Sequence, residues 1–201
     1  MRVGGIVLCG GRSSRMGRAK AWLPFGDELM LPRVVRILAA IVKPIIVVAA
    51  PGQDVPPLPK DIEITRDPEE GRGPLQGLVA GLQAIGNRAD AIYLSSCDVP
   101  FLQPGFVLRM IELLGPHSIC VPKIGEFHHP LAAVYRIGVL DTALQLLAQS
   151  RPRPVYLFES LPTRVVGAAD LADVDPTFQS LRNLNSPADY EAALRDLNAS
   201  K

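Results

Sequence analysis

Residues 8–20 read LCGGRSSRMGRAK, and this stretch decides how the fold and function of the chain are interpreted. It follows an apolar run, Val3–Leu8, that predicts a buried first strand. Its glycines let the backbone approach a ligand closely and expose N–H groups, while its three arginines and Lys20 suit a polyphosphate. The stretch therefore predicts a nucleotide-phosphate loop at the carboxyl end of the first strand. The alternative is an ordinary strand-to-helix loop with solvated arginines.

Outward from this loop, strand and helix patterns alternate through the first 115 residues. The predicted strands span residues 3–8, 45–50, 62–65, 91–96, 119–122, 131–135 and 163–166, and the predicted helices span residues 31–42, 73–82, 104–114, 139–147, 154–161 and 187–197. Such alternation favours a three-layer α/β/α sandwich with a mostly parallel sheet. We expect a single domain over residues 1–201, and a ligand at the carboxyl ends of the strands.

Composition excludes several classes of function. The chain is 48% hydrophobic with a net charge of +1, which favours a packed globule and gives no general attraction to nucleic acid or to an anionic membrane. No apolar run approaches the roughly 18 residues of a membrane span, and we expect no signal peptide. The three cysteines form no C-x-x-C pair, so the simplest expectation is a reducing cytoplasm.

The spacing of the loop excludes two common phosphate-binding motifs. A Walker A loop requires a serine or threonine after its lysine, but Ala21 follows Lys20. The dinucleotide fingerprint G-x-G-x-x-G fails because Gly10 and Gly11 are adjacent. A different cradle remains, in which backbone N–H groups hold phosphates while Arg15 and Lys20 neutralise their charge.

Two aspartates follow predicted strands. Asp98 comes after a buried apolar run, where it would ligate Mg²⁺ and assist an in-line attack at phosphorus; the alternative is a turn or N-cap aspartate. Asp67 would accept hydrogen bonds from a guanine edge or a ribose hydroxyl; the alternative is a turn residue before Pro68.

Four further polar residues are candidate ligand contacts. His128 and His129 would point to opposite faces of an extended chain, so they make a poor joint metal site, although one could contact a substrate phosphate. Asn183 and Asn185 alternate and share a face, where they would hold a ligand or a hydrated metal. The alternatives are a strand-edge pair of histidines and turn-forming asparagines before a Ser186 N-cap.

The order of these motifs resembles the molybdenum cofactor guanylyltransferase family. Residues 8–20 match its pattern L-x-G-G-x-S-x-R-M-G-x-x-K. Four further matches follow in the family's order: Gly73–Leu78, Cys97–Pro100, His129–Pro130 and Asn183–Pro187. The resemblance extends from about Val3 to about Leu194, almost the whole chain.

This resemblance implies a glycosyltransferase-A-like nucleotidyltransferase fold and Mg²⁺-dependent transfer of GMP from GTP to molybdenum-molybdopterin, with release of pyrophosphate. It implies GTP contacts from Leu8, Cys9, Gly10, Gly11, Lys20, Asp67, Gly73, Gly77 and Asp98. It implies catalytic roles for Arg15, Lys20 and Asp98, with Asp98 as the metal ligand. On the pterin side it implies His129, Asn183 and Asn185. Molybdoenzyme maturation proteins are further expected partners.

The chain departs from the family at two places. Ala49-Ala50-Pro51 stands where some relatives carry asparagine after the second strand, which removes a contact to the base or ribose. Cys9 replaces the alanine that is common in the loop. A sister nucleotidyltransferase using CTP or another phosphorylated acceptor therefore remains an alternative. A non-catalytic nucleotide-binding maturation partner is another, although Lys20 and Asp98 are both present.

Overall fold

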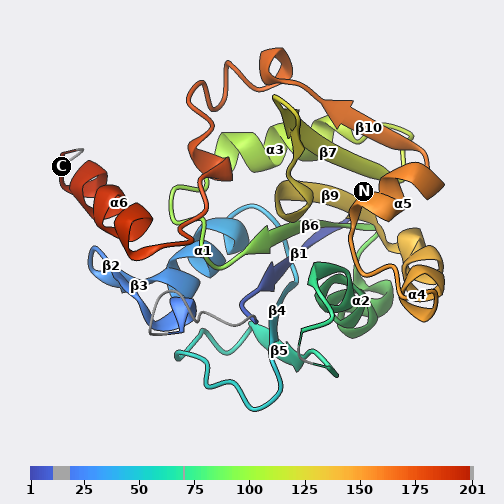
Figure 1. Cartoon of the computed structure of the whole chain (residues 1–201), viewed down its shortest axis with the longest axis horizontal. Coiled ribbons are helices and arrows are strands. Elements are labelled where there is room, and N and C mark those ends of the chain that lie inside the picture. The colour runs from blue at the N-terminus through green and yellow to red at the C-terminus, as the bar shows by residue number, and fades with distance from the viewer. Residues whose placement is uncertain (11–18, 70, 200–201) are drawn as a thin grey trace.

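The computed structural model describes residues 1–10, 19–69 and 71–199. Its centre is a twisted sheet in the order β10-β7-β9-β6-β1-β4-β5, with β8 attached to β7 (Figure 1). The strands are β1 (Val3–Leu8), β4 (Ile45–Ala49), β5 (Glu63–Arg66), β6 (Ala91–Ser96), β7 (Ile119–Ile124), β8 (Phe127–His128), β9 (Ala133–Arg136) and β10 (Thr163–Val166). A separate hairpin joins β2 (Pro24–Phe25) to β3 (Glu28–Leu29).

Most neighbouring strands in this sheet are parallel. β1 pairs in parallel with β4 and β6, β4 with β5, and β7 with β10. β9 is antiparallel to both β6 and β7, and the short β8 is antiparallel to β7. The predicted mostly parallel sheet is thus confirmed, and the carboxyl ends of β1, β4, β5 and β6 meet at one edge.

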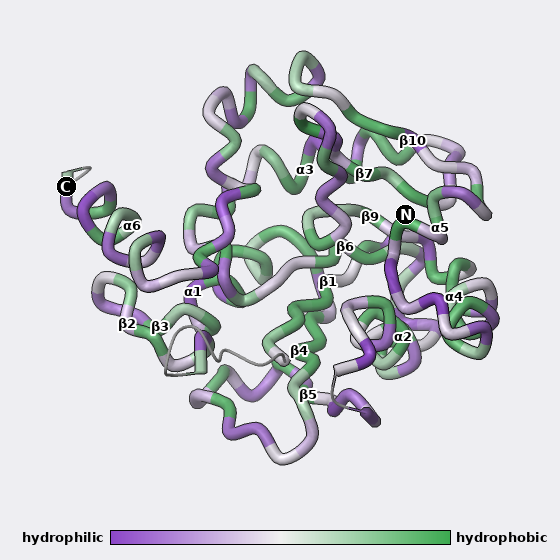
Figure 2. The backbone as a smooth tube through the Cα atoms, in the orientation of Figure 1, coloured by the Kyte–Doolittle hydropathy of each residue, from purple (hydrophilic) through white to green (hydrophobic). Residues whose placement is uncertain are grey.

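Helices cover both faces of the sheet, which confirms the three-layer prediction. α1 (Met30–Ala39) and α3 (Pro104–Leu113) pack on one face, and α2 (Pro74–Ile85), α4 (Leu140–Ala148) and α5 (Val155–Ser160) pack on the other (Figure 1). The central strands β1 and β4 are hydrophobic and buried, and Figure 2 shows them mostly in green. α6 (Pro187–Ala199) lies at one end, against the β2–β3 hairpin.

Two glycines allow α2 to lie directly on β1. A Cβ atom at Gly81 would lie 2.7 Å from the side chain of Ile6, and one at Gly77 would lie 3.1 Å from Leu8. Both glycines therefore allow the helix to lie close to the sheet. This close packing brings the first turn of α2 to the carboxyl end of β1.

Several predicted bounds are wrong. The helix predicted to reach Val42 ends at Ala39, because the N–H groups of Ile41 and Val42 both bond to the carbonyl of Leu38 in a tightening turn. The strand predicted over residues 131–135 begins only at Ala133, after a 3₁₀ turn over residues 130–132. The short β2–β3 and β8 pairings were not predicted, since two-residue strands carry no periodic signal.

Of the helices that the structure describes, none has the length and hydropathy that crossing a bilayer requires.

Candidate active site

A cavity of about 450 Å³ opens where the carboxyl ends of β1, β4 and β6 meet the start of α2. Its walls are formed by Leu8, Cys9, Gly10, Lys20, Val48, Ala49, Ala50, Asp67, Gly71, Gly73, Pro74, Gly77, Ser96, Cys97, Asp98, Leu131, Asn183 and Asn185. Open α/β sheets bind ligands at this edge because loops that follow neighbouring strands converge there. The volume lies within the range usual for small-molecule sites.

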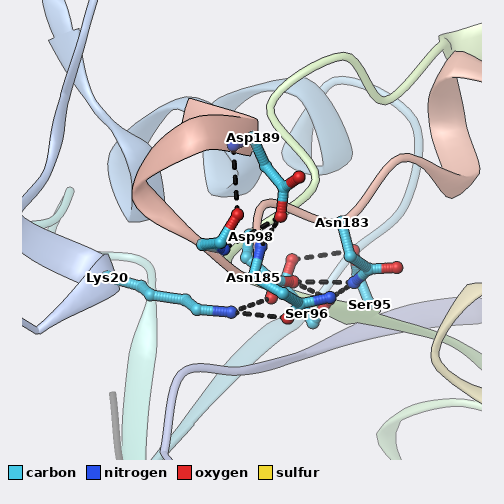
Figure 3. A network of polar contacts seen from close by, with 8 residues as sticks. Lys20, Ser95, Ser96, Asp98, Asn183, Asn185 and Asp189 are labelled. Atoms are coloured by element: carbon cyan, nitrogen blue, oxygen red, sulfur yellow. Dashed lines mark hydrogen bonds and ion pairs between the residues drawn. The ribbon is translucent and has the colours of Figure 1, made fainter. Parts of the chain in front are cut away.

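The polar centre of the cavity is a network around Asp98 (Figure 3). The Lys20 ammonium donates to Asp98 Oδ2 at 2.6 Å and to Asn185 Oδ1 at 2.9 Å. The other carboxylate oxygen, Asp98 Oδ1, accepts from Ser96 Oγ at 2.6 Å and from Asn183 Nδ2 at 2.9 Å. Asp98 is only 8% exposed, so the network supplies the partners that a buried carboxylate requires.

The sequence around β6 explains the position of Asp98. Ser96 ends the strand and Asp98 follows two residues later, so the Ser96 hydroxyl can reach the carboxylate. The Asp98 carbonyl accepts the N–H of Leu184 at 3.0 Å, which ties the segment carrying both asparagines to the end of β6. Ser96 was not predicted as a site residue. Its place two residues before Asp98 could have indicated it, because residues two apart in an extended chain lie on the same face.

A capping box fixes the asparagine segment from its other end. Ser186 Oγ accepts the N–H of Asp189 at 3.2 Å, which confirms the predicted N-cap of α6. Asp189 Oδ2 in turn accepts the N–H groups of Asn185 and Ser186 at 3.0 and 2.9 Å. Asn183 and Asn185, predicted to share a face, are thereby brought together at Asp98.

Asp67 lies on the far wall of the cavity, directly after β5. Its N–H donates to the carbonyl of Ala49 at 2.8 Å, and its Oδ1 accepts the N–H of Glu69 at 3.2 Å. Desolvation raises the pKa of the Asp67 carboxyl and outweighs the hydrogen bond from the Glu69 N–H, which lowers it; the Glu69 charge raises it further. The Asp67 carboxylate therefore has fewer hydrogen-bond and charge partners to offset its burial than the Asp98 carboxylate has.

Gln53 braces the loop after β4, and sequence analysis missed it. Its Oε1 accepts the N–H of Ala50 and its Nε2 donates to the carbonyl of Cys9, both at 2.9 Å. Arg66 Nη1 also bonds to the carbonyls of Ala50 and Gln53. A Cβ atom at Gly10 would lie 3.0 Å from the amide nitrogen of Ala50, so the two backbones touch. No local pattern predicts this brace, because Pro51-Gly52 reverses the chain before Gln53.

The two cysteines in the cavity wall are packing residues. Cys9 and Cys97 are 6% and 5% exposed. Burial raises the pKa of the Cys9 thiol to about 11 and raises that of Cys97 well above its ordinary value. Both side chains therefore remain neutral thiols at physiological pH, which makes them poor nucleophiles.

Lys20 begins a short 3₁₀ turn that ends at Trp22. The N–H of Leu23 bonds to the Lys20 carbonyl at 3.1 Å, and the indole Nε1 of Trp22 donates to the Asp54 carbonyl at 3.2 Å. The backbone of Lys20 is thus held in a turn whose Trp22 side chain is bonded to the segment that follows β4.

Gly73 caps α2 at a position that favours glycine. Its φ is +80°, which residues with a side chain rarely adopt, and a Cβ atom there would lie 3.2 Å from the Pro152 carbonyl oxygen. The turn places Gly73 and the first residues of α2 in the cavity wall.

Most residues implied by the family resemblance meet in this cavity. Those lining it are Leu8, Cys9, Gly10, Lys20, Asp67, Gly73, Gly77, Asp98, Asn183 and Asn185. His129 is not among the lining residues; burial and the adjacent His128 lower its pKa, and its N–H bonds to the Pro122 carbonyl. Gly11 and Arg15 lie outside the described residues. The roles of all these residues remain predictions.

The donor set fits a hard divalent cation that arrives with phosphates. Within residues 1–10, 19–69 and 71–199, no three His, Cys, Asp or Glu side chains are grouped to hold a metal alone. Asp98 Oδ2 and Asn185 Oδ1 converge on one cation, the Lys20 ammonium. Mg²⁺ prefers oxygen donors and commonly takes one or two carboxylates, with substrate phosphates and water completing its shell.

Comparison with known proteins places this geometry in context. The family model of the MobA-like NTP transferase domain matches residues 5–163. A "probable molybdenum cofactor guanylyltransferase" of Pelotomaculum thermopropionicum is 30% identical over 192 residues, covering 94% of this chain and 90% of the relative. One from Mycobacterium avium is 34% identical over 198 residues, covering 96% and 95%.

Solved structures share the fold at low sequence identity. Molybdopterin-guanine dinucleotide biosynthesis protein A from Archaeoglobus fulgidus aligns with a TM-score of 0.80 at 20% identity, covering 99% of this chain and all of that one. The 2-C-methyl-D-erythritol 4-phosphate cytidylyltransferase of Thermus thermophilus aligns at 0.73 and 15% identity, covering 98% and 100%. These alignments confirm the predicted α/β nucleotidyltransferase fold.

Proposed function

The chain belongs to the MobA-like NTP transferase family, and from that premise we propose that it transfers GMP from GTP to molybdenum-molybdopterin. The products are molybdopterin guanine dinucleotide and pyrophosphate. The observation that carries the proposal is the meeting of Lys20, Asp98 and Asn185 in the wall of a cavity of about 450 Å³.

The residues of the cavity suit the charges of this reaction. The terminal phosphate of the pterin attacks the α-phosphorus of GTP, a new P–O bond forms, and the bond to the β-phosphate oxygen breaks with the electron pair leaving on pyrophosphate. Lys20 would neutralise phosphate charge, and Asp98 would hold Mg²⁺ together with the neighbouring Asn185. Mg²⁺, when bound, supplies electrophilic stabilisation of the phosphoryl oxygens.

Recognition of the base falls to the opposite wall. The Asp67 carboxylate, which retains free accepting capacity, suits the N–H donors of a guanine edge or a ribose hydroxyl. Ala50 presents no side-chain amide there, and its N–H is held by Gln53. GTP is the proposed donor; CTP is the competing nucleotide of a sister enzyme.

The proposed setting is the cytoplasm. All three cysteines, Cys9, Cys97 and Cys120, are free and buried, which suits a reducing compartment. The dinucleotide product would pass to molybdoenzyme maturation proteins.

Product identification tests the proposal directly. The chain is incubated with molybdenum-loaded molybdopterin, Mg²⁺ and either GTP or CTP, and the dinucleotide is identified by mass spectrometry. We expect the guanine dinucleotide and equimolar pyrophosphate from GTP. Preferential formation of the cytosine dinucleotide would instead assign the sister activity.

Asp98→Asn is the matched variant, because it preserves shape while removing the charge. It should abolish most turnover without unfolding the protein. Near-wild-type release of pyrophosphate by Asp98→Asn would contradict the metal role of Asp98. If the wild type also shows no turnover, the chain would instead be a non-catalytic, nucleotide-binding maturation partner.

A further inference from the structure

We propose that Lys20 is an internal counter-cation that occupies the metal position of the free protein, so that Lys20 and a divalent metal compete for the same oxygen atoms until a nucleotide draws the lysine away. This inference rests on the proposed function, which supplies the metal and the triphosphate. It assigns Lys20 a second role besides binding phosphate.

The geometry places the ammonium where a metal ion would bind. Lys20 Nζ lies 2.6 Å from Asp98 Oδ2 and 2.9 Å from Asn185 Oδ1. Figure 3 draws both contacts as dashed lines. Asp98 Oδ1 is already engaged by two neutral donors, Ser96 and Asn183. Asp98 Oδ2 is therefore the oxygen directed at a cation, and a metal that takes it must displace the ammonium.

Burial makes a cation at this position necessary. The side chains of Lys20 and Asp98 are 17% and 11% exposed, so the ion pair is largely shielded from water. Removing the cation alone would leave a buried carboxylate uncompensated, which is strongly unfavourable. Lys20 thus keeps the empty site electrostatically satisfied. A compact ammonium at the end of a flexible stem suits this task better than the planar guanidinium of arginine.

Exchange requires movement of the side chain only. The backbone of Lys20 is fixed in the 3₁₀ turn by the bond from Leu23 N–H to its carbonyl. Once the metal holds Asp98, the displaced ammonium needs new anionic partners, and a bound triphosphate provides them. Metal and nucleotide binding are therefore coupled: the free protein binds metal weakly, and nucleotide raises the affinity by giving Lys20 another partner.

Binding of Mn²⁺ alone tests the exchange. Free Mn²⁺ is counted by electron paramagnetic resonance during titration of the wild type, Lys20→Met and Lys43→Met, without nucleotide. Lys43 is exposed at the amino end of β4, away from the cavity, and its variant loses the same single charge. Lys20→Met should bind Mn²⁺ about tenfold or more tightly than the other two proteins, on the scale of one charge-assisted hydrogen bond.

Three results would overturn the proposal: equal Mn²⁺ affinity in the wild type and Lys20→Met, weaker affinity in Lys20→Met, or the same gain in Lys43→Met. A measurement on the unaltered chain covers the case in which Lys20→Met does not fold. Acetylation of Lys20 by acetic anhydride, quantified by peptide mass spectrometry, should speed up several-fold when Mn²⁺ saturates the protein. An unchanged or slower rate contradicts the exchange.

These outcomes separate the inference from the proposed function. If the wild type forms guanine dinucleotide but neither measurement shows competition, only the exchange fails. If competition appears and no guanine dinucleotide forms, only the choice of reaction fails.

Discussion

At the scale of single residues, the two carboxylates of the cavity differ in how completely their burial is compensated. Asp98 has one cation and two neutral donors on its oxygens. For Asp67, the described part of the chain supplies one donor to the carboxylate, the N–H of Glu69. A carboxylate with few partners costs free energy in the empty protein and is available to a ligand.

Asp67→Asn should therefore stabilise the fold while weakening nucleotide binding. Burial raises the pKa of Asp67 in the folded state, so the unfolded carboxyl ionises more readily, and its contribution to stability falls as pH rises past the unfolded pKa of about 3.9. The asparagine variant should unfold at higher urea concentration at pH 7, and the gain should vanish near pH 3.

Urea titrations at both pH values, alongside titration with GTP, check this prediction. A variant that is equally stable at pH 7 and pH 3 relative to wild type would show that Asp67 is not the desolvated group. A variant with unchanged GTP affinity would remove Asp67 from the binding wall.

At the scale of elements, the site depends on how closely α2 and β4 are held to β1. Gly81 and Gly77 let α2 rest on β1, and Gln53 ties the ends of β1 and β4 together. Neither contact involves a charged group. Both set the position of the cavity walls.

Gly81→Ala should destabilise the protein, although alanine is normally the better helix former. The added Cβ would lie 2.7 Å from two atoms of the fully buried Ile6. Overpacking of this kind destabilises a core by about 1–3 kcal/mol, which outweighs the gain in helix propensity of about 1 kcal/mol. Gly105→Ala in α3 is the control, because its nearest contact, 3.5 Å to Val174, is ordinary. Thermal melts should move in opposite directions for the two variants; parallel shifts would refute the packing argument.

Gln53→Met should loosen the cavity wall that is proposed to face the base. It keeps the length of the side chain but removes two hydrogen bonds, which lowers the free energy of unfolding by about 1–2 kcal/mol. The apparent KM for GTP should rise with kcat little changed, since Gln53 is not a lining residue. Gln145→Met on the exposed side of α4 is the matched control. An unaltered KM would confine Gln53 to a purely structural role.

At the scale of the whole molecule, the candidate active site joins distant parts of the chain. The bond from Lys20 to Asn185 spans 165 residues, and that from Lys20 to Asp98 spans 78. A ligand in the cavity also touches walls from β1, β4, β6 and α2, so its binding should stabilise the fold as a unit.

GTP with Mg²⁺ at about 100 times its Kd should raise the free energy of unfolding by about 2.7 kcal/mol. For a chain of this size that corresponds to a rise in Tm of roughly 5–10 °C. Differential scanning fluorimetry against CTP, and against EDTA in place of Mg²⁺, checks both nucleotide preference and metal dependence. A larger shift with CTP than with GTP would contradict the proposed donor.

The long-range character of the centre also limits what the sequence could predict. Strand ends were predictable from apolar runs, so Asp67 and Asp98 were correctly placed at one edge of the sheet. The network itself was not: the bond from Leu184 N–H to the Asp98 carbonyl depends on tertiary packing, and Gln53 reaches its partners only after a chain reversal. The reversed strand β9 was hidden because strand direction leaves no local mark in the sequence.

The tie between Trp22 and the loop after β4 has a practical consequence. Trp22 is the sole tryptophan of the chain, lies two residues beyond Lys20, is 37% exposed and donates to the Asp54 carbonyl. Its indole emission therefore comes from one place, between the cation of the site and the segment that carries Ala50 and Gln53. Excitation at a wavelength selective for indole gives the protein a label-free optical reporter of events in the cavity, which makes stopped-flow measurement of ligand arrival feasible without any introduced dye.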